Sequence, residues 1–600
     1  MATYEPWIKI PEPDNRTGVN STEDETLTGD DAAWALTCAF LILTMQTGFA
    51  MLECGCVSSK NMANIMIKNV CDVSIGGITY WVIGYGLTYG RPATAFCGLG
   101  DFFFMERNVV RMGSRYSHYF FQFSFASTAT TIVSGAVAER MKLHSYMVFA
   151  FLNIFVYCIP ASWCWNDAGW LKKLHFFDFA GVCVVHLNGG TSALVAALLL
   201  GPRVNRFEHP ERYAMSSPVT ALTGMFMLMW AWLGFNCGST FGVTQSKWKI
   251  SALVAVTTLN GGIGGGLLGL FLSLIIRKGK VSVDYVINSI LGGLVSVTGA
   301  CAVTTPYEAL VIGCIGGCVA IGATYLLEKL RIDDPVGAIP VHFFAAFWGT
   351  LAVGLFGKSN PSLDYLKGYN GFLHGGSWRL LGISGLGALA MILWSASLTV
   401  IILLITKMLF GIRMSAEDEL MGADWVEHDI RKDRLSTKLE DVLRGVDEDT
   451  IGRVVEKLLI EISSEQDGQK SKHVPSEKIY TIGTRGDAIQ SNEDASNRNG
   501  YLSTANYDRP ESAHIWMGPP SRSRSLTSVR SQTIPPDEPI PPPTSNFGTT
   551  ATTPMTVPYK LSFANAEARA RTRIANTRTY LMSRAEEERT NPDLAPNIPR

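Results

Sequence analysis

Charged residues are scarce in the first two thirds of this 600-residue chain. Asp, Glu, Lys and Arg make up 17% of the sequence, but they concentrate in the last third, which leaves residues 32–411 far more apolar than a soluble domain. This apolar part also lacks a long basic cluster, and the formal net charge is −1, so nothing indicates nucleic-acid binding. The composition is typical of an all-α polytopic membrane protein.

Other signals are missing as well. The twelve cysteines all precede residue 319, at spacings that indicate neither a disulfide framework nor a metal site. The glycine-rich run 260–266 lacks the preceding strand, the Lys and the Ser/Thr of a phosphate-binding loop, and it favours close helix packing instead. The first 31 residues have no apolar core of a signal peptide. We therefore expect no cofactor, no metal, no enzyme activity and no ATP-driven pumping.

Apolar stretches long enough to span a membrane recur along the chain. A span needs about 20 apolar residues, and this criterion predicts eleven transmembrane helices. They are expected at residues 32–53, 70–89, 118–138, 145–165, 179–201, 216–238, 250–276, 285–303, 308–327, 336–357 and 385–411.

The ends of the chain can be assigned to sides of the membrane. Residues 1–31 are acidic and contain two glycosylation sequons, at Asn15 and Asn20, which are modified only on the lumenal side. Lys60 and Lys68 follow the first span, which favours an extracellular N-terminus under the positive-inside rule. With an odd number of spans, the C-terminal tail is cytosolic, and we expect a multi-pass protein of the plasma membrane.

Two histidines lie in apolar segments at the end of one shared pattern. Asp178 to His186 and Asp334 to His342 both read DxxGxxxVH. The histidines fall in the fifth and tenth expected spans, which run in opposite directions, so the pattern predicts a five-plus-five inverted repeat. Eight helical residues cover about 12 Å, which carries each histidine from the membrane interface toward the midplane.

A single histidine in an apolar helix is more often a buried side chain bonded to a neighbouring carbonyl. Two at matched positions favour a pore-lining pair, because ionisable groups within a membrane usually mark a pathway. Neutral imidazoles can share a hydrogen bond or accept a proton. A dry lumen disfavours a charged permeant, so a cation with a small, stable neutral form fits this pore best.

Several motifs together resemble the ammonium transporter family (Amt/Mep/Rh) over nearly all of residues 32–430. The run Met45–Leu52, followed by Ser59–Asn61, looks like the plant and invertebrate Amt branch. Five further segments carry the similarity: Phe121–Ala126, Gly135–Arg140, Asp178–His186, Gly234–Ser239 and Asp333–His342.

The resemblance implies a homotrimer with one pore per subunit, and it implies roles for individual residues. Phe125, Trp165 and Ser239 would recruit ammonium at the outer face, where an aromatic ring attracts a cation by about 0.5–2 kcal/mol. Phe125 and Phe235 would form a stacked gate above the pore-lining histidines. Asp178 would be a structural residue that fixes the backbone.

Each of these residues also has a plainer interpretation. Trp165 could belong to an interfacial aromatic belt, the phenylalanines could only pack, and Ser239 could cap a helix. We expect Trp232 to line the wall of the pore rather than to bind the ion. Lys68 and Asp72 are spaced i, i+4 and are expected to form a structural ion pair.

The chain is expected to have four parts: the extracellular segment 1–31, the transmembrane domain 32–411, the cytosolic segment 412–466 and a disordered tail 467–600. Residues 419–429 resemble the cytosolic motif of the family, residues 436–462 have helical apolar spacing, and the rest is rich in Pro, Ser and Arg.

The sequence thus predicts a transporter or channel for ammonium, with methylammonium as an analogue. The alternative is an ammonium sensor that signals through its tail. A gas channel of the Rh type is disfavoured by Trp165 and Ser239. Net ammonia passage and electrogenic ammonium transport both stay open.

Overall fold

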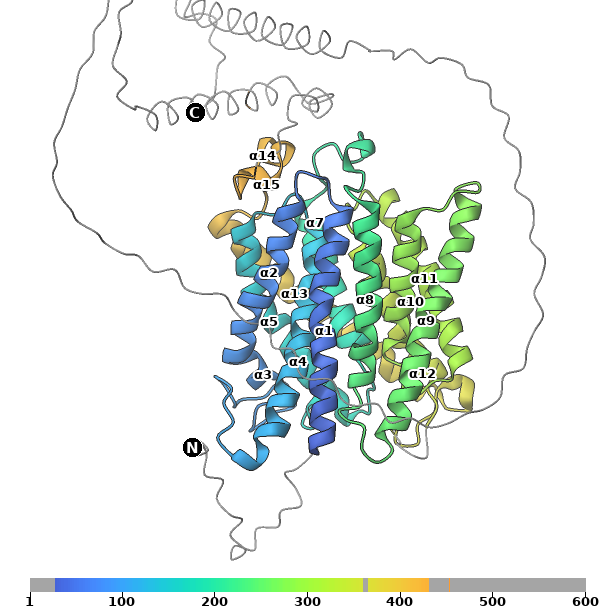
Figure 1. Cartoon of the computed structure of the whole chain (residues 1–600). Helices are drawn as coiled ribbons and strands as arrows, with labels where there is room; N and C mark the ends of the chain where they lie inside the picture. The colour runs from blue at the N-terminus through green and yellow to red at the C-terminus, as the bar shows by residue number, and fades with distance from the viewer. Residues whose placement is uncertain (1–26, 360–364, 431–452, 454–600) are drawn as a thin grey trace, which may run out of the picture. The chain divides into compact units, whose positions relative to one another are not determined.

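Long helices lie side by side through the part of the chain that the structure describes (Figure 1). This computed structural model describes residues 27–359, 365–430 and 453, all within the first of two units, residues 1–480. The described residues form helices and two isolated bridges but no strand. The predictions for Asn15, Asn20, residues 436–462 and the tail 467–600 lie outside the described residues.

The long helices follow one another with short connections. In order they are α1 (Gly29–Cys56), α2 (Met62–Thr79), α3 (Tyr85–Tyr89), α4 (Val109–Ala136), α5 (Leu143–Trp165), α7 (Asn188–Leu200), α8 (Pro218–Gly238), α9 (Lys247–Ile276), α10 (Val283–Thr298), α11 (Pro306–Lys329), α12 (Ala346–Phe356) and α13 (Trp378–Phe410). Wide π-helical turns at Tyr80–Gly84, Val182–Leu187 and Pro340–Ala345 lead into α3, α7 and α12. The short elements are α6 (Trp170–Lys173), α14 (Ala416–Met421), α15 (Ala423–Val426) and the 3₁₀ turns Pro210–Tyr213 and Phe372–His374.

Eight helical segments of the described part are long and apolar enough to cross a membrane. They are residues 29–56, 62–89, 143–173, 182–200, 218–238, 247–276, 306–329 and 378–410. Two further apolar helices, 283–298 and 340–356, are shorter than this criterion requires. α4 is 28 residues long but carries many polar side chains, several of them buried.

Three predicted spans begin too late in the chain, and the last of them was expected from residue 385 although α13 starts at Trp378. The second was expected from residue 70, but α2 starts at Met62 because its polar residues Asn64 and Lys68 are buried rather than placed in a loop. The third was expected from residue 118, but the Asn108 side chain accepts a hydrogen bond from Val110 N at 3.0 Å and caps α4 there.

The predicted ion pair between Lys68 and Asp72 is wrong. Lys68 Nζ donates to Asn64 Oδ1 at 2.6 Å, and Asp72 Oδ1 accepts from Tyr146 OH at 2.6 Å. Both side chains are fully buried, and each is held by an uncharged partner, Lys68 by Asn64 of α2 and Asp72 by Tyr146 of α5. Spacing along a helix brings two residues near each other, but burial decides which groups they contact.

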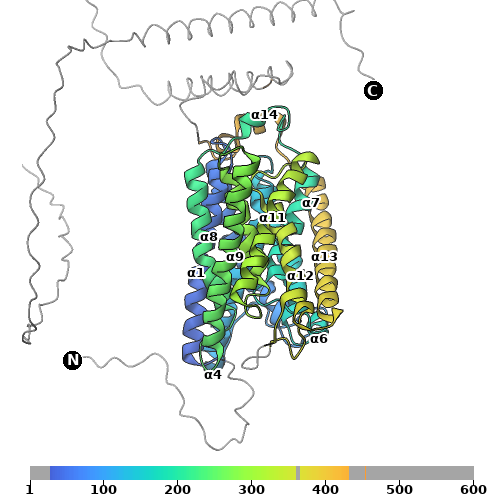
Figure 2. The same cartoon turned by 90° about the vertical axis from the view of Figure 1, so that its right-hand side faces the viewer.

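The glycine-rich run 260–266 packs α9 against its neighbours, as predicted. A Cβ atom on Gly265 would overlap with the Ser289 carbonyl of α10, so only glycine allows this approach. Figure 2 shows α9 beside α8, and α9, α10 and α11 pack on one another.

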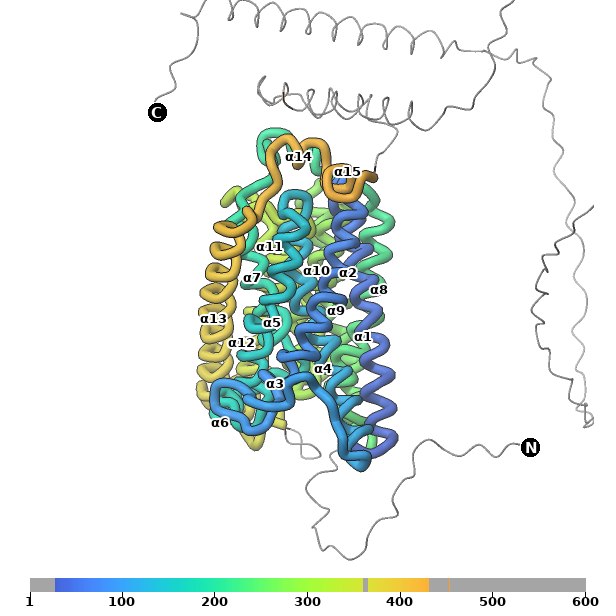
Figure 3. The backbone as a smooth tube through the Cα atoms, turned by 90° about the vertical axis from the view of Figure 1, so that its left-hand side faces the viewer, coloured from blue at the N-terminus to red at the C-terminus, as the bar shows by residue number. Residues whose placement is uncertain are grey.

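The two ends of the helical bundle carry different connections. α3 and α6 lie at one end, and α14 and α15 lie at the other (Figure 3). Lys60, just before α2, donates to the carbonyls of Glu419 and Leu420 at 2.9 and 2.7 Å, and Asn64 N donates to Asp424 Oδ1 at 2.8 Å. The segment after α13 is thus attached to the start of α2.

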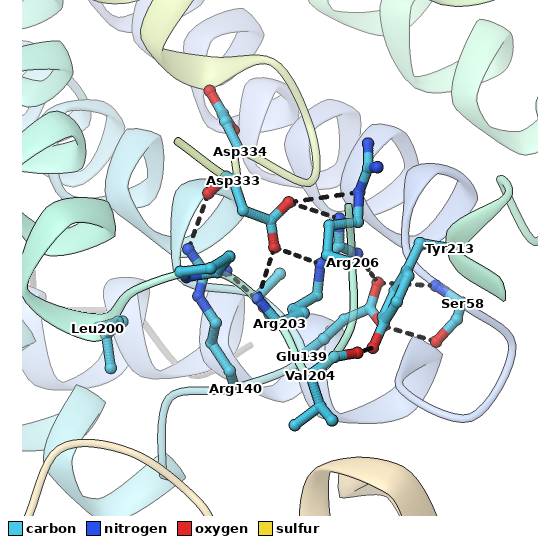
Figure 4. Close-up of polar contacts among 12 residues, drawn as sticks. Ser58, Glu139, Arg140, Leu200, Arg203, Val204, Arg206, Tyr213, Asp333 and Asp334 are labelled. Carbon is cyan, nitrogen blue, oxygen red and sulfur yellow. Dashed lines mark hydrogen bonds and ion pairs between the residues drawn. The ribbon is translucent and has the colours of Figure 1, made fainter. Parts of the chain in front are cut away.

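A buried charged cluster joins three connections at the end that carries α14 (Figure 4). Arg203 donates to Asp333 through Nε and Nη2, both at 2.8 Å, and to Glu139 through Nη1 at 2.6 Å. Arg140 Nη2 donates to the Asp333 carbonyl at 2.8 Å, and Glu139 also accepts from the Ser58 hydroxyl at 2.7 Å. Since Asp333 precedes Asp334, the cluster fixes the start of the second DxxGxxxVH motif.

The arginines of this cluster hold its carboxylates in the charged form. Burial alone would raise the pKa of Asp333, but the charge and hydrogen bonds of Arg203 hold that pKa well below its usual value. Burial also acts to raise the pKa of Glu139, but the charge of Arg203 and the hydrogen bonds of Ser58 lower it below its usual value. The folded protein therefore binds fewer protons at these sites than the unfolded chain does.

Acidification is expected to destabilise the protein through this cluster. Because the folded-state pKa values are lowered, the stabilisation is complete above the ordinary carboxyl pKa of about 4 and is lost as the pH falls below it. The unfolding temperature of the detergent-purified protein should fall as the pH is lowered from about 5 to about 2.5, and the fall should be shallower in Asp333→Asn. Equal slopes in the two proteins would contradict this assignment.

Candidate functional site

The first DxxGxxxVH motif folds around the Asp178 carboxylate. Asp178 Oδ1 accepts from the backbone N–H groups of Gly181 and Val182 at 2.9 and 2.8 Å. Oδ2 accepts from Cys183 and Val184 at 2.8 and 3.0 Å. Gly181 has φ of 94°, a left-handed conformation that glycine adopts without strain. The carboxylate thus satisfies the first free N–H groups of the turn that carries His186.

The second motif repeats this local structure. Asp334 Oδ1 accepts from Gly337 N at 3.0 Å and Oδ2 accepts from Ile339 N at 2.7 Å. Gly337 has φ of 84° and matches Gly181. A π-helical turn follows in both motifs and contains the histidine. Such turns widen the backbone and often occur at functional sites.

The two histidines lie against each other inside the protein. His186 Nδ1 is 3.2 Å from His342 Nδ1, and the ring centroids are 5.2 Å apart at an interplanar angle of 21°. α7 approaches His342 closely, because a Cβ atom on Gly190 would overlap with the His342 carbonyl. The pair predicted from the sequence is therefore brought together in space.

The shared hydrogen bond fixes complementary roles for the outer edges of the rings. One Nδ1 must carry the proton and the other must accept it, so in a neutral pair one Nε2 is an acceptor and the other is a donor. His186 Nε2 is buried and has no hydrogen-bond partner within the described residues. A small molecule that both donates and accepts hydrogen bonds can therefore bind along this edge.

Aromatic rings connect the histidines to the gate predicted from the sequence. Phe235 stacks on Phe125 with centroids 4.0 Å apart and an interplanar angle of 9°. The ring centroids of Phe235 and His186 are 5.6 Å apart. Trp232 stacks on His186 at 5.0 Å, and its Nε1 donates to Thr298 Oγ1 at 2.9 Å, which leaves it no hydrogen for a ligand.

A cavity of about 310 Å³ opens on the other side of the phenylalanine pair. Phe125, Trp165 and Ser239 all line it, and the centroids of Phe125 and Trp165 are 6.0 Å apart. The Ser239 hydroxyl donates to the Phe235 carbonyl at 3.0 Å, so its lone pairs remain free to accept. We call this space the outer cavity.

Gln122 is a residue of the outer cavity to which the sequence analysis gave no role. It is buried, with a relative exposure of 5%, it lines the cavity, and no hydrogen bond to its amide is found in the described part of the chain. A ligand in the cavity can therefore form a hydrogen bond with this amide. Its position in the motif Phe121–Ala126, between two aromatic residues, was the signal available.

A small cavity of about 20 Å³ lies beyond the histidines. His342 lines it together with Glu53 and Asn288. A volume of about 10–15 Å³ is enough for one water molecule, so this inner cavity has room for one molecule of that size. Neither Glu53 nor Asn288 was predicted, although Glu53 is an ionisable residue in an apolar span, like the histidines.

The arrangement of the helices, the histidine pair and the two cavities defines a class of protein. Helices that are long and apolar enough to span a membrane place two imidazoles between an outer aromatic cavity and a small, mostly apolar inner cavity, which is the organisation of a transporter or channel. A family model described as Ammonium Transporter Family matches residues 33–432, more than half of the chain. The chain therefore belongs to the ammonium transporter family, and its membership points to transport rather than catalysis.

Curated relatives come from several kingdoms. A Caenorhabditis elegans protein named for ammonium transport is 40% identical over 423 residues, which cover 68% of this chain and 61% of that protein. The chain thus spans less than two thirds of that relative. The ammonium transporter Amt2 of Archaeoglobus fulgidus is 35% identical over 66% of this chain and 87% of its own length.

Solved structures of Amt and Mep proteins have the same fold. A structure titled Sensor Amt Protein is 32% identical, covers 67% of this chain and 98% of its own, and superposes with a TM-score of 0.61. The Candida albicans Mep2 structure is 27% identical, covers 65% of this chain and 88% of its own, and has a TM-score of 0.60.

Proposed function

We propose that this chain moves ammonium across the plasma membrane by recruiting the ion in the outer cavity and conducting ammonia past His186 and His342. One observation carries the proposal. The outer cavity, the stacked pair Phe125 and Phe235, the histidine pair and the inner cavity follow one another in contact. Similarity to named ammonium transporters supports the substrate.

The outer cavity offers what an ammonium ion needs. The faces of Phe125 and Trp165 attract a cation, and Ser239 accepts one N–H bond. Gln122 adds a carbonyl oxygen as a second acceptor. Asp178 also borders the cavity, but four backbone N–H groups occupy its two oxygens. The ion is thus recruited by oriented dipoles and rings, and no free carboxylate binds other cations there.

The ion gives its proton to water in the outer cavity before the gate (NH₄⁺ + H₂O → NH₃ + H₃O⁺), and ammonia passes the gate. Phe125 and Phe235 are in contact and buried, and the next polar atoms along this line of contacts within the described residues are those of the two imidazoles. A bare charge in such surroundings is costly, whereas ammonia is small and neutral. One Nε2 of the histidine pair then accepts a hydrogen bond from an N–H group of ammonia, and the other Nε2 donates a hydrogen bond to the ammonia nitrogen.

The same proposal covers topology and assembly. We infer eleven spans in a five-plus-five inverted repeat, supported by the matching structures around Asp178 and Asp334. The end with Arg140, Arg203 and Arg206 faces the cytosol, in line with the positive-inside rule, and the N-terminus faces outward. The resemblance to the family supports a homotrimer with one pore in each subunit.

Uptake into a cell that lacks other ammonium transporters tests this function. We expect saturable uptake of labelled methylammonium by the native chain, with ammonium as competitor. Gln122→Leu should raise KM about tenfold, because one ligand bond of about 1.4 kcal/mol corresponds to that factor. Thr223→Val, which removes a hydroxyl on the exposed side of α8, is the matched control and should leave KM unchanged. Absence of uptake by the native chain would refute the proposal.

The second candidate function is ammonium sensing, and the similarity to a structure titled Sensor Amt Protein favours keeping it. The two functions differ in what the long C-terminal part does. Truncation after residue 466 should leave uptake unchanged if the chain is a transporter alone. Normal uptake by the truncated chain together with loss of a downstream ammonium response would favour the sensor.

A further inference from the structure

The inner end of the histidine pair contains more negative than positive charge. Glu53 on α1 and Asp72 on α2 are both buried, and Lys68 is the one buried cation close to them among the described residues. Lys68 donates to Asn64 rather than to either carboxyl group. Buried charges need a partner, so this region requires one further proton or cation.

The hydrogen bonds distinguish the two carboxyl groups. Glu53 Oε1 accepts from Ser134 Oγ and Oε2 accepts from Asn69 Nδ2, both at 2.6 Å, as expected for an ionised carboxylate. Asp72 accepts from Tyr146 through one oxygen, while its Oδ2 has no partner within the described residues. Of the two groups, this bonding pattern favours Asp72 as the protonated one and Glu53 as the ionised one.

Glu53 is also the carboxylate that faces the pathway. It lines the inner cavity with His342, whereas Asp72 does not. Ser134, Asn69 and the backbone N–H of Gly135 donate to it, which leaves about one of the four acceptor positions of an ionised carboxylate. Asp178 at the outer cavity differs, because its four bonds to backbone N–H groups use those positions.

Asn288 provides a second, independent observation at this cavity. Asn288 is buried, with a relative exposure of 5%, and its side chain lines the cavity. No hydrogen bond to its amide is found in the described part of the chain. A molecule in the cavity can therefore donate a hydrogen bond to its amide oxygen.

We propose that Glu53, Asn288 and His342 form an inner ammonium-binding site. The site rests on the proposed transport function and extends it to the cytosolic face. Ammonia that passes His342 takes a proton from cytosolic water (NH₃ + H₃O⁺ → NH₄⁺ + H₂O), and the ammonium formed is held by the Glu53 carboxylate and the Asn288 oxygen before release. The cavity volume of about 20 Å³ suits one such ion. Because a carboxylate also binds other small cations, potassium competes at the inner face and not at the outer one.

Membrane vesicles of both orientations test this site with the full chain. In inside-out vesicles, KCl should slow methylammonium uptake at least fivefold, and in right-side-out vesicles it should have no effect. Glu53→Gln should abolish the potassium effect and raise the half-saturating concentration at the inner face about tenfold, with the outer face unchanged. Asn288→Leu should do the same to a smaller extent. Asp72→Asn, which removes a buried carboxyl outside the cavity, should keep the potassium effect.

The outcomes separate this site from the transport function. No uptake by native vesicles of either orientation would refute transport itself. Uptake with equal potassium sensitivity at both faces would overturn the inner site without the use of any variant. The site would also be overturned if Glu53→Gln lowered uptake equally from both faces, since that is the result of a purely structural role.

Discussion

Replacing Arg203 with methionine is expected to remove most of the folded protein from the membrane. The guanidinium neutralises Glu139 and Asp333, whose side chains are 2% and 1% exposed. Methionine keeps much of the apolar volume but leaves two buried carboxylates without a cation. Breaking a buried ion pair in this way costs about 3–5 kcal/mol, which is a large share of a typical stability of about 5–15 kcal/mol.

Arg206 offers a matched control for this substitution. It is 18% exposed, pairs with the half-exposed Glu328 at 2.7 Å, and lies 3.5 Å from Asp333. A partly exposed pair is worth about 0–1 kcal/mol, and Arg203 still neutralises Asp333 when Arg206 is removed, so Arg206→Met should lower the yield of folded protein much less than Arg203→Met does. The measurement is the monodisperse peak of the detergent extract in gel filtration, with the unfolding temperature of what remains.

A compensating set of substitutions separates charge from packing. Glu139→Gln and Asp333→Asn remove the two uncompensated charges, so together they should restore part of the yield that Arg203→Met loses. Equal losses in Arg203→Met and Arg206→Met, or no recovery in the triple variant, would show that the cluster does not act through its charges.

The partners within this charged cluster could not be predicted from the sequence. Arg203 lies 64 residues from Glu139 and 130 residues from Asp333, and no local pattern links them. The two DxxGxxxVH motifs could be recognised because aspartate, glycine and histidine perform the same local task twice within one short segment. Periodicity and apolar length likewise located most helices, since burial in a membrane acts on each segment separately.

Other features of the site depend on contacts that only the folded chain makes. The i, i+4 spacing of Lys68 and Asp72 predicted an ion pair, but in the folded chain Lys68 binds Asn64 and Asp72 binds Tyr146. Gln122 and Asn288 became candidates only because their amides lack partners inside cavities. The rule that identified the histidines could have identified Glu53, because it too is ionisable and lies within an apolar span.

His186→Leu and His342→Leu are each expected to lower methylammonium uptake at least tenfold. Leucine keeps the ring-sized volume between Trp232, Phe235 and the partner histidine, so the helices should stay packed. It removes the hydrogen-bond acceptor and donor that replace water around ammonia in the lumen. Losing even one such bond to a neutral molecule costs about 1–1.5 kcal/mol, and the remaining imidazole then also lacks its Nδ1 partner.

The two variants must be compared with a histidine outside the pathway. His144 is exposed at the start of α5, 6.5 Å from Phe410, and His144→Leu should transport like the native chain. Gel filtration of each variant checks that assembly is intact, so that a loss of uptake reports on the pore. Because the neutral pair needs one donor and one acceptor, both single variants should lose uptake to a similar extent. Undiminished uptake in either one would mean that ammonia does not pass along the His186 and His342 edge, and the conduction pathway would have to lie elsewhere in the helical bundle.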